Sequence, residues 1–527
     1  MADSLDTFHC SNIAQFYDGR SIFLTGGTGF IGKVIVEKLL RSCPNINTIY
    51  FLVRPKKGKT CEERMDSIFS LPLFKKLNEK DPEARNKVVP IQGDITHKSL
   101  GISDEDRQTL VDNVDIIMHS AATVKFNEHI RIAMEMNVIA VIEMIKLAKA
   151  MKKLEIFCHV STAYSQCNQP KSLDILEKFY PVSVEPENII EAMGWMNDKM
   201  LTGFTEPLID KYPNTYTFTK ALAEHLIKKE SENIPFMIVR PSIVSSSISD
   251  PFPGWVDNYN GVSGMMVAVG RGIVRSLYAP EIKHDIVPVD FVSNCIIVST
   301  WYYGVSRLKT PMICNCTSGN VNPTSFVDMQ KVVLPVFSHH YPLTSIFRRP
   351  NFAFAPNRFL NQYWQMVSHY IPAIILDGLT VLVGMKPRFM NIYRTIDSSI
   401  STLDFFIQNE WKWGHTEFSK ILKAVPEDDK EAFDFDMRKI DWSNYYADMT
   451  IGVKKFLVKD DMAELPKARN IHRRYKMVRW LSSTIFILLA GRFFFLKSER
   501  FRKLWFEALF SIYKFLHLLR IPTFRIV

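Results

Sequence analysis

A glycine-rich turn near the N-terminus constrains the fold of this chain more than any other feature of its sequence. Residues 25–32 are TGGTGFIG, directly after the strand-like SIFL and directly before a helical pattern. In fingerprints of this kind the glycines make a tight turn, let the backbone approach a pyrophosphate and pack a helix against a strand. The helix N-terminus offers free N–H groups to the phosphates. We therefore expect dinucleotide contacts from Thr25, Gly26, Gly27, Thr28, Gly29, Phe30, Ile31 and Gly32.

Apolar, β-branched runs recur along the first half of the chain. They occupy residues 21–25, 48–54, 88–91, 115–120, 155–160 and 236–240, and helical patterns separate several of them. Alternating strands and helices predict an α/β fold with a Rossmann-like, doubly wound parallel sheet. The helix after the glycine turn is expected to end near Cys43, because Pro44 cannot continue it.

The chain is too long for a single core, and its pattern changes near residue 350. Long apolar and aromatic segments after that point predict a mostly helical C-terminal domain. We expect an α/β domain over residues 1–350, a helical domain over 351–466 and a hydrophobic tail over 467–527. Residues 370–384 (YIPAIILDGLTVLVG) favour a buried helix or the lining of an apolar substrate site over a membrane span, which stays the alternative, because the segment is short and Asp377 opposes a span.

The tail carries the net charge of the chain. The formal charge is +10, but residues 467–527 hold 14 Lys or Arg and 2 acidic residues, so the remainder carries −2. A body that binds nucleic acid is therefore not supported. Residues 480–496 are apolar apart from Arg492 and basic on both flanks, which predicts a membrane anchor, with a core helix as the alternative. Residues 504–519 indicate an interfacial helix or a second partial span.

The eight cysteines form no pattern of metal ligands. None belongs to a CxxC pair with a second CxxC or with spaced histidines, so we expect neither a metal site nor a disulfide framework. Residues 1–10 lack the apolar stretch of a signal peptide. Free thiols indicate a reducing compartment, so we expect the body to face the cytosol or to be imported folded.

The end of the second predicted strand indicates which dinucleotide binds. Arg54 stands at its tip, followed by Lys56, Lys57 and Lys59, where NAD sites favour an acidic residue. An arginine offers a planar fork to a 2′-phosphate, so NADPH is favoured over NADH. Asp94 follows the third strand and is a weaker candidate to accept from the adenine amino group.

A second group of residues is suited to acid–base catalysis. Tyr216 and Lys220 are four residues apart in YTFTK, which places them on one helical face, so the ammonium can lower the pKa of the phenol and reach a ribose. A phenol so tuned can donate its proton to a carbonyl oxygen that receives hydride. Ser161 and Thr162 follow the fifth strand, where either hydroxyl can hold the same oxygen.

Several blocks of the sequence resemble the extended short-chain dehydrogenase/reductase superfamily and, more narrowly, the animal fatty acyl-CoA reductases. The shared blocks are TGGTGFIGKVIVEKLLRSCP, HSAATVKFNE, HVSTAYSQCN, PNTYTFTKALAE, VRPSIV, PFPGWVDNYNG, FRRPN, YWQMVSH and IDWSNYY. The first blocks mark the superfamily, whereas PFPGWVDNYNG and the C-terminal blocks are specific to the reductases. Ser120 stands where a cysteine is expected, and Gly27 where alanine is more usual.

The resemblance implies an enzyme that reduces long-chain acyl-CoA to the primary alcohol with two hydrides from NADPH, for ether lipid and wax synthesis. It implies that Tyr216 donates the proton, that Lys220 anchors the ribose, and that Thr162, or else Ser161, is the supporting hydroxyl. Ala121 is implied as a further cofactor contact. The relatives also imply a tail anchored in the peroxisomal membrane with the catalytic domain in the cytosol, the endoplasmic reticulum being the alternative.

Two other functions are compatible with parts of the sequence. A membrane-anchored hydroxysteroid or sterol dehydrogenase shares the glycine turn, the Tyr216–Lys220 pair and an apolar tail, but the PFPGW block speaks against it. A non-catalytic nucleotide-binding module that regulates a membrane partner would be favoured by loss of Tyr216 or Lys220, and both are present.

Overall fold

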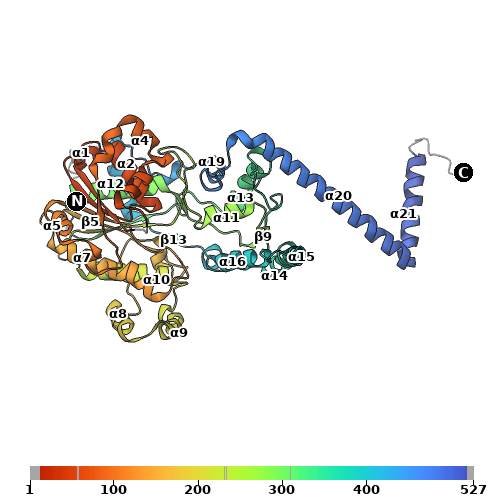
Figure 1. The fold of residues 1–527 in the computed structure, drawn as a ribbon, viewed down its shortest axis with the longest axis horizontal. Coiled ribbons are helices and arrows are strands. Elements are labelled where there is room, and N and C mark those ends of the chain that lie inside the picture. The colour runs from red at the N-terminus through yellow and green to blue at the C-terminus, as the bar shows by residue number, and fades with distance from the viewer. Residues whose placement is uncertain (1–11, 56–57, 231, 233, 309, 519–527) are drawn as a thin grey trace, which may run out of the picture.

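A parallel β-sheet forms the centre of the N-terminal part of the molecule (Figure 1). The computed structural model describes residues 12–55, 58–230, 232, 234–308 and 310–518. Its largest sheet has seven strands in the order β11-β7-β5-β4-β1-β2-β3, and all neighbouring pairs are parallel. The strands are β1 (Ser21–Thr25), β2 (Thr48–Val53), β3 (Val88–Gln92), β4 (Ile116–His119), β5 (Ile156–Val160), β7 (Phe236–Pro241) and β11 (Met312–Cys316).

The six strands predicted from the sequence are confirmed to within one or two residues, and so is the doubly wound parallel sheet. The strand order reverses direction between β1 and β4. In sheets of this type, ligands bind outside the carboxyl ends of the strands at that reversal. The glycine turn follows β1 and therefore lies at this position.

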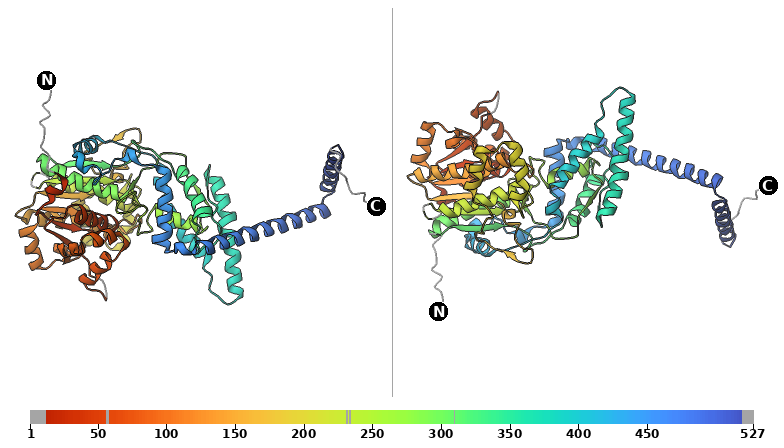
Figure 2. Two further views of the ribbon diagram at one scale, coloured as in Figure 1. Left: turned by 90° about the horizontal axis from the view of Figure 1, so that it is seen from above. Right: turned by 90° about the horizontal axis from the view of Figure 1, so that it is seen from below.

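Helices cover both faces of the sheet (Figure 2). Side chains alternate along β1, so Ile22 and Leu24 pack with α2 (Phe30–Ser42) and α12 (Val289–Ser306), whereas Phe23 packs on the opposite face. The helices of that second face include α7 (Ala140–Ala150) and α10 (Thr215–Glu230). The predicted end of α2 just before Pro44 is confirmed.

The chain beyond residue 350 forms a helical part beside the α/β body (Figure 1). Its helices include α14 (Arg358–Gln365), α15 (Ile371–Leu382), α16 (Phe389–Ser401), α17 (Asp404–Ile407) and α19 (Trp442–Gly452), and they lie with α11 (Val262–Gly270) and α13 (Phe326–Pro335).

Part of this later chain returns to the α/β body. β13 (Lys412–Trp413) pairs in parallel with β6 (Asp174–Ile175), and α18 (Thr416–Ala424) packs on α12. The backbone N–H of Ile13 donates to Asp429 Oδ2 at 2.8 Å, across 416 residues of sequence. The domain division at residue 350 stays a prediction, and these contacts cross it.

The tail forms two helices that extend away from the body (Figure 1). They are α20 (Leu465–Lys497) and α21 (Glu499–Leu518), so of residues 504–519 only residue 519 lies outside the described chain. Among the described residues, Met462–Lys497 and Arg358–Leu382 are long and apolar enough to cross a membrane. The alternative of a core helix for residues 480–496 is wrong, because their side chains are exposed, Phe486 by 73%.

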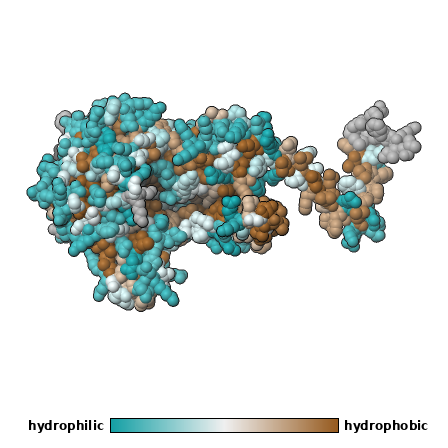
Figure 3. Space-filling view, viewed as in Figure 1, coloured by the Kyte–Doolittle hydropathy of each residue, from teal (hydrophilic) through white to brown (hydrophobic). Residues whose placement is uncertain are grey.

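Residues 371–382 form the helix α15, but the prediction that this segment is buried is wrong, and its alternative role as the lining of an apolar substrate site stays a prediction. Ile374 and Ile375 of α15 are 57% and 58% exposed, and Leu382 is 83% exposed. Figure 3 shows a brown apolar patch over α14 and α15, at the lower right of the compact part of the molecule. Hydrophobicity alone does not distinguish a buried helix from an exposed apolar one.

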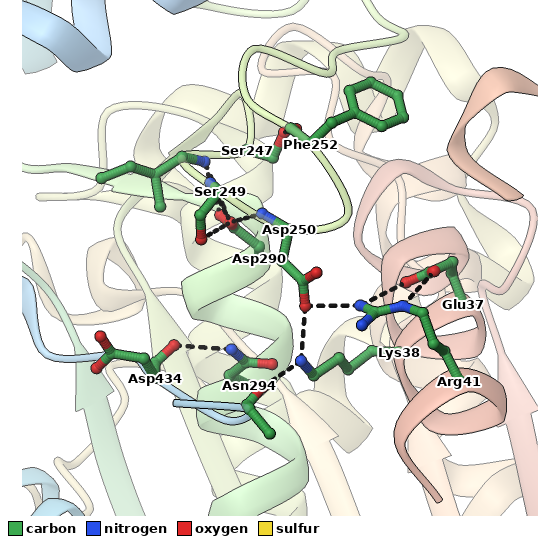
Figure 4. Close-up of polar contacts among 12 residues, drawn as sticks. Glu37, Lys38, Arg41, Ser247, Ser249, Asp250, Phe252, Asp290, Asn294 and Asp434 are labelled. Carbon is green, nitrogen blue, oxygen red and sulfur yellow. Dashed lines mark hydrogen bonds and ion pairs between the residues drawn. The ribbon is translucent and has the colours of Figure 1, made fainter. Parts of the chain in front are cut away.

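Ion pairs fasten the loop that contains PFPGW to α2 (Figure 4). The Asp250 carboxylate pairs with Lys38 Nζ at 2.6 Å and with Arg41 Nη2 at 2.7 Å. From α12, the buried Asp290 carboxylate accepts hydrogen bonds from the backbone N–H groups of residues 248–250. The loop is therefore held beside the helix that follows the glycine turn.

The backbone of the same loop touches α19. A Cβ on Gly254 would overlap with the carbonyl oxygen of Asp448, and a Cβ on Gly452 would overlap with that of Gly254. Two glycines thus permit backbone-to-backbone contact between the loop and the helical part.

Substituting Gly452→Ala should destabilise the protein. The added Cβ would overlap with the Gly254 carbonyl, so we expect the free energy of unfolding to fall by about 1–3 kcal/mol, the usual cost of overpacking. The control is Gly203→Ala in α9 (Asp198–Ile209), where a Cβ meets nothing within 4 Å and the change should be neutral or slightly stabilising. Equal thermal midpoints for the two variants would contradict the close contact.

Candidate active site

The glycine turn has a geometry that only glycine permits. β1 ends at Thr25, and Gly29 caps α2. Gly26 has a φ of 74°, and a Cβ there would lie 2.5 Å from the backbone N of Ala121. A Cβ on Gly32 would overlap with the carbonyl oxygen of Gly26. The turn therefore packs closely against both the helix that follows it and the chain after β4.

The predicted turn residues form a cradle that fits a pyrophosphate. α2 begins at Phe30, so the N–H groups of its first turn have no acceptor within the helix. Those donors and the helix dipole favour an anion. Gly27, where the resembling reductases more often have alanine, lies against the Phe51 ring, with which a Cβ would overlap. The Thr25 hydroxyl is bonded to His119 Nδ1 at 2.7 Å and accepts from the Ala121 backbone N–H at 3.4 Å, so it joins the end of β1 to the chain after β4.

Arg54 and Asp94 form an ion pair beyond the ends of β2 and β3. Arg54 Nε lies 2.7 Å from Asp94 Oδ2, and the Arg54 side chain is 66% exposed. Partial burial opposes ionisation of Asp94, but hydrogen bonds from Thr96 and the charge of Arg54 hold its pKa below the ordinary value. Arg54 and Asp94, which the sequence predicted as separate contacts of the adenosine part of the cofactor, are therefore paired with each other. Lys56 and Lys57 lie outside the described residues, and Lys59 is exposed.

Tyr216 and Thr162 come together where α10 crosses the end of β5. The Thr162 side chain lies near the Tyr216 hydroxyl, and its own hydroxyl donates to the carbonyl oxygen of Pro241 at 3.3 Å. Burial raises the pKa of Tyr216 to about 12, and the interaction with Thr162 acts in the opposite direction. The ring of Phe126 stacks on Tyr216, with centroids 5.7 Å apart. The phenol is therefore held in its protonated form in a largely apolar setting.

Lys220 lies one helical turn after Tyr216, but its ammonium is bound to the backbone. Nζ donates to the carbonyl oxygen of Val160 at 2.8 Å. Burial lowers the pKa of Lys220 to about 8, opposed by the negative charge of Glu224. The predicted lowering of the Tyr216 pKa by this ammonium is not found in this ligand-free structure, where burial dominates.

Ser161 has a different partner from Thr162. Its hydroxyl donates to Glu224 Oε1 at 2.6 Å, and Ser165 and Gln166 donate to the same carboxylate. Arg240 completes the group with two bonds, at 2.9 and 2.6 Å. Of the two candidate hydroxyls, Thr162 is therefore the one that faces Tyr216.

Sequence reasoning missed Glu224 and Arg240, which are 2% and 0% exposed. A signal for both exists. Glu224 follows Lys220 by four residues on the same helical face, and Arg240 interrupts an otherwise apolar strand. Charged residues at such buried positions indicate a buried ion pair.

Two buried histidines were also missed, and they link the glycine turn to Lys220. His119 and His159 end neighbouring strands in register, and their rings stack 5.4 Å apart. Burial and the charge of Lys220 lower the pKa of His119 to about 3, and the pKa of His159 falls for the same reasons, so both rings are neutral at pH 7. Within the described chain, the ring nitrogens of His159 have no hydrogen-bond partner.

The helical part contributes an aromatic wall to the site. Phe406 of α17 packs on Phe126 and Tyr164, with centroids 5.1 and 5.0 Å apart, and Tyr164 also contacts Trp411 and Trp413. Because Phe126 stacks on Tyr216, this wall reaches the candidate proton donor. Aromatic residues far apart in sequence form it, so no local motif predicts it.

Solved structures share the fold. The reductase domain of a nonribosomal peptide synthetase from Mycobacterium tuberculosis matches 85% of this chain and 95% of its own, with a TM-score of 0.57 and 17% identity. The terminal R domain of the myxalamid pathway matches 84% and 91%, with a TM-score of 0.53 and 20% identity. At these identities the likeness concerns the fold alone.

Two family models, both described as "Male sterility protein", match residues 24–296 and 368–460. Curated relatives match nearly the whole chain. Fatty acyl-CoA reductase 1 of Xenopus laevis and of Homo sapiens are each 40% identical over 97% of this chain and 98% of their own. Fatty acyl-CoA reductase 2 of Mus musculus is 42% identical over the same shares. The chain therefore belongs to the fatty acyl-CoA reductase family.

Proposed function

We propose that this protein reduces long-chain fatty acyl-CoA to the primary fatty alcohol, with NADPH as donor and release of CoA. The observation that carries the proposal is that Tyr216 lies beside Thr162 and one helical turn before Lys220, at the sheet edge where the glycine turn lies. The names of the whole-length relatives supply the substrate class. We further propose that the fatty alcohol enters ether lipid and wax synthesis.

The reaction needs two reductions, and two NADPH molecules, bound one after the other, would supply one hydride each. Tyr216 gives its proton to the thioester oxygen as the carbonyl carbon gains hydride, which forms a hemithioacetal. That hydroxyl returns its proton to Tyr216 as the carbon–sulfur bond breaks, leaving aldehyde and CoA thiolate. Tyr216 then donates again as the aldehyde becomes the alcohol, and solvent restores its proton.

Neighbouring residues set the conditions for these proton transfers. Thr162 holds the Tyr216 hydroxyl in place, and Lys220, one turn away, is the group that would hold a ribose hydroxyl. The aromatic rings of Phe126 and Phe406 exclude water and offer an apolar surface to an acyl chain. The chain's own residues thus supply the acid, its support and the apolar surroundings.

For membrane placement we propose a tail anchored in the peroxisomal membrane with the catalytic domain in the cytosol. The exposed apolar helix α20 with its basic flanks supports an anchor. The resemblance to peroxisomal relatives supports the choice of membrane, and the endoplasmic reticulum is the alternative that localisation experiments would separate.

Removing the phenolic proton donor should abolish turnover but not nucleotide binding. For Tyr216→Phe we expect alcohol formation from acyl-CoA to fall by roughly 10²-fold or more, the usual scale for a general acid. Tyr212→Phe is the matched control, because it also removes a buried hydroxyl, but one that has no hydrogen-bond partner among the described residues. Near-normal turnover of Tyr216→Phe, assayed with a panel of acyl-CoAs for aldehyde and alcohol, would assign proton donation to another group.

Arg54 should set the preference for NADPH. A charge-assisted hydrogen bond is worth ~1.5–3 kcal/mol, so Arg54→Asp should narrow or invert the NADPH-to-NADH ratio of kcat/KM by roughly ten- to hundredfold. Lys59→Asp in the same exposed loop is the control and should change the ratio little. If the ratio is unchanged in Arg54→Asp, another residue recognises the 2′-phosphate.

Deleting residues 467–527 should remove firm membrane attachment. The deleted segment carries the local charge of +12 and the apolar helix, and each basic residue near an anionic surface adds ~1 kcal/mol to binding. We expect the full chain, and not the truncated chain, to resist carbonate extraction from cell membranes. Fluorescence microscopy of the full chain with peroxisomal and reticular markers tests the choice of membrane. Carbonate resistance of the truncated chain would place the anchor elsewhere.

A further inference from the structure

The apolar surface of α15 has no role in the site described above. After α14, the π-helical turn η7 (Met366–Tyr370) continues the helix directly into α15. We call the exposed apolar residues of α15 and the turn after it the hairpin patch: Ile374, Ile375, Leu379, Leu382, Val383 and Met385, each more than half exposed. A contiguous exposed surface of this kind marks an interaction site.

The base of this helix is fixed to the body, and its end is not. Asn361 Oδ1 accepts from Ser276 Oγ at 2.8 Å, and His369 Nε2 accepts from the Arg275 backbone N–H at 3.0 Å. Ala373 is fully buried. Beyond Ala373 the helix leaves the body and turns back into α16 (Figure 2, right).

Asp377 stabilises the hairpin, because its carboxylate is bonded to α16 and does not stand unpaired on the apolar side. Its carboxylate accepts from the backbone N–H groups of Arg388, Phe389 and Met390, between 2.8 and 2.9 Å, and so caps α16. A second bond joins the hydroxyl of Tyr370 to Asp397 of α16. The carboxylate that opposed contact with lipid is therefore satisfied inside the hairpin.

The part of α15 beyond Ala373 is too short to cross a membrane, although the whole helical segment Arg358–Leu382 is long enough. Only nine residues lie between Ala373 and the end of α15 at Leu382, which is ~14 Å of helix. The hydrocarbon core of a bilayer is ~30 Å thick. The hairpin patch can therefore reach into one leaflet only.

Basic residues surround the hairpin patch. Lys386, Arg388 and Arg394 are exposed on the hairpin itself. At its base, burial together with the charges of Arg348 and Arg479 lowers the pKa of Arg275 to about 10. Among the described residues, neither Arg275 nor Arg348 has a carboxylate within ion-pair distance. The exposed charges of Lys386, Arg388 and Arg394 complement anionic lipid headgroups.

The position of Arg479 also shows that the apolar run of the tail begins near the base of the hairpin. Arg479 lies close enough to Arg275 to affect it, and Arg275 contacts His369 at the base of the hairpin. The apolar run of α20 begins immediately afterwards, at Trp480. Figure 3 shows apolar surface on the hairpin side and on the tail, at the same end of the molecule.

We propose that the hairpin patch inserts into one leaflet of an anionic membrane, as a second membrane contact separate from the tail. α16 leads from the hairpin to α17, where Phe406 packs on Phe126 beside Tyr216. Docking therefore places the aromatic wall of the active site near the lipid surface, where long acyl chains partition. This consequence rests on the proposed reductase function; the docking itself does not.

A depth measurement on the full chain tests the insertion directly. Leu382→Cys carries an environment-sensitive fluorophore, and Phe204→Cys in α9, 57% exposed on the α/β body, is the matched control. Wild type labelled in parallel gives the background from native cysteines. In vesicles of phosphatidylcholine and phosphatidylserine, the label at position 382 should shift to the blue and be quenched by lipids that carry a quencher on the acyl chain. A water-like emission at position 382, with no more quenching than at position 204, would overturn the proposal.

Activity provides a second readout. The double variant Leu382→Asp with Val383→Asp alters two side chains that are 83% and 67% exposed, so folding should be retained. We expect its KM for long-chain acyl-CoA in anionic vesicles to rise roughly tenfold, with kcat and the KM in detergent unchanged. Phe204→Asp should show no rise. An unchanged KM in vesicles would contradict the proposal, whereas absence of reduction by wild type would overturn the reductase function and leave the depth measurement to decide the docking.

Discussion

The buried ion pair between Glu224 and Arg240 holds the site together. Burying two charges is costly unless every donor and acceptor is satisfied, and removal of one partner typically costs about 3–5 kcal/mol. Here the carboxylate takes five hydrogen bonds, and Arg240 also donates to a main-chain carbonyl, that of Lys178, at 3.0 Å. The pair joins α10, β7 and the end of β5. It thereby fixes the register in which Thr162 meets Tyr216.

The site belongs to both parts of the molecule. The α/β body supplies the glycine turn, Tyr216 and Lys220, whereas the chain after residue 400 supplies the aromatic wall around Phe406. The loop between them is fixed at Asp250 and by the glycine contact with α19. One sheet architecture serves many functions, and here the helical part supplies the surroundings of the candidate proton donor.

Local patterns predicted what local chemistry determines. The six strands, α2 and the glycine turn follow from side-chain periodicity and backbone sterics, and the structure confirms all three. Such patterns did not predict tertiary contacts, which include the Arg54–Asp94 pair, the partner of Ser161 and the aromatic wall. The exposure of residues 370–384 and the raised pKa of Tyr216 were missed for the same reason, because both depend on what surrounds a residue.

The bond between Ile13 and Asp429 has a consequence for how the protein is made. During synthesis, domains generally fold from the N-terminus as the chain emerges. Here the carboxylate that caps the first N–H of α1 (Ile13–Tyr17) belongs to Asp429, so it is absent until residue 429 has left the ribosome. In the same way, β6 can pair with β13 only after residues 412–413 have emerged. The last residues that the α/β body needs therefore leave the ribosome only shortly before the hydrophobic tail does. The catalytic part becomes able to fold at almost the same time as the tail becomes able to insert into a membrane.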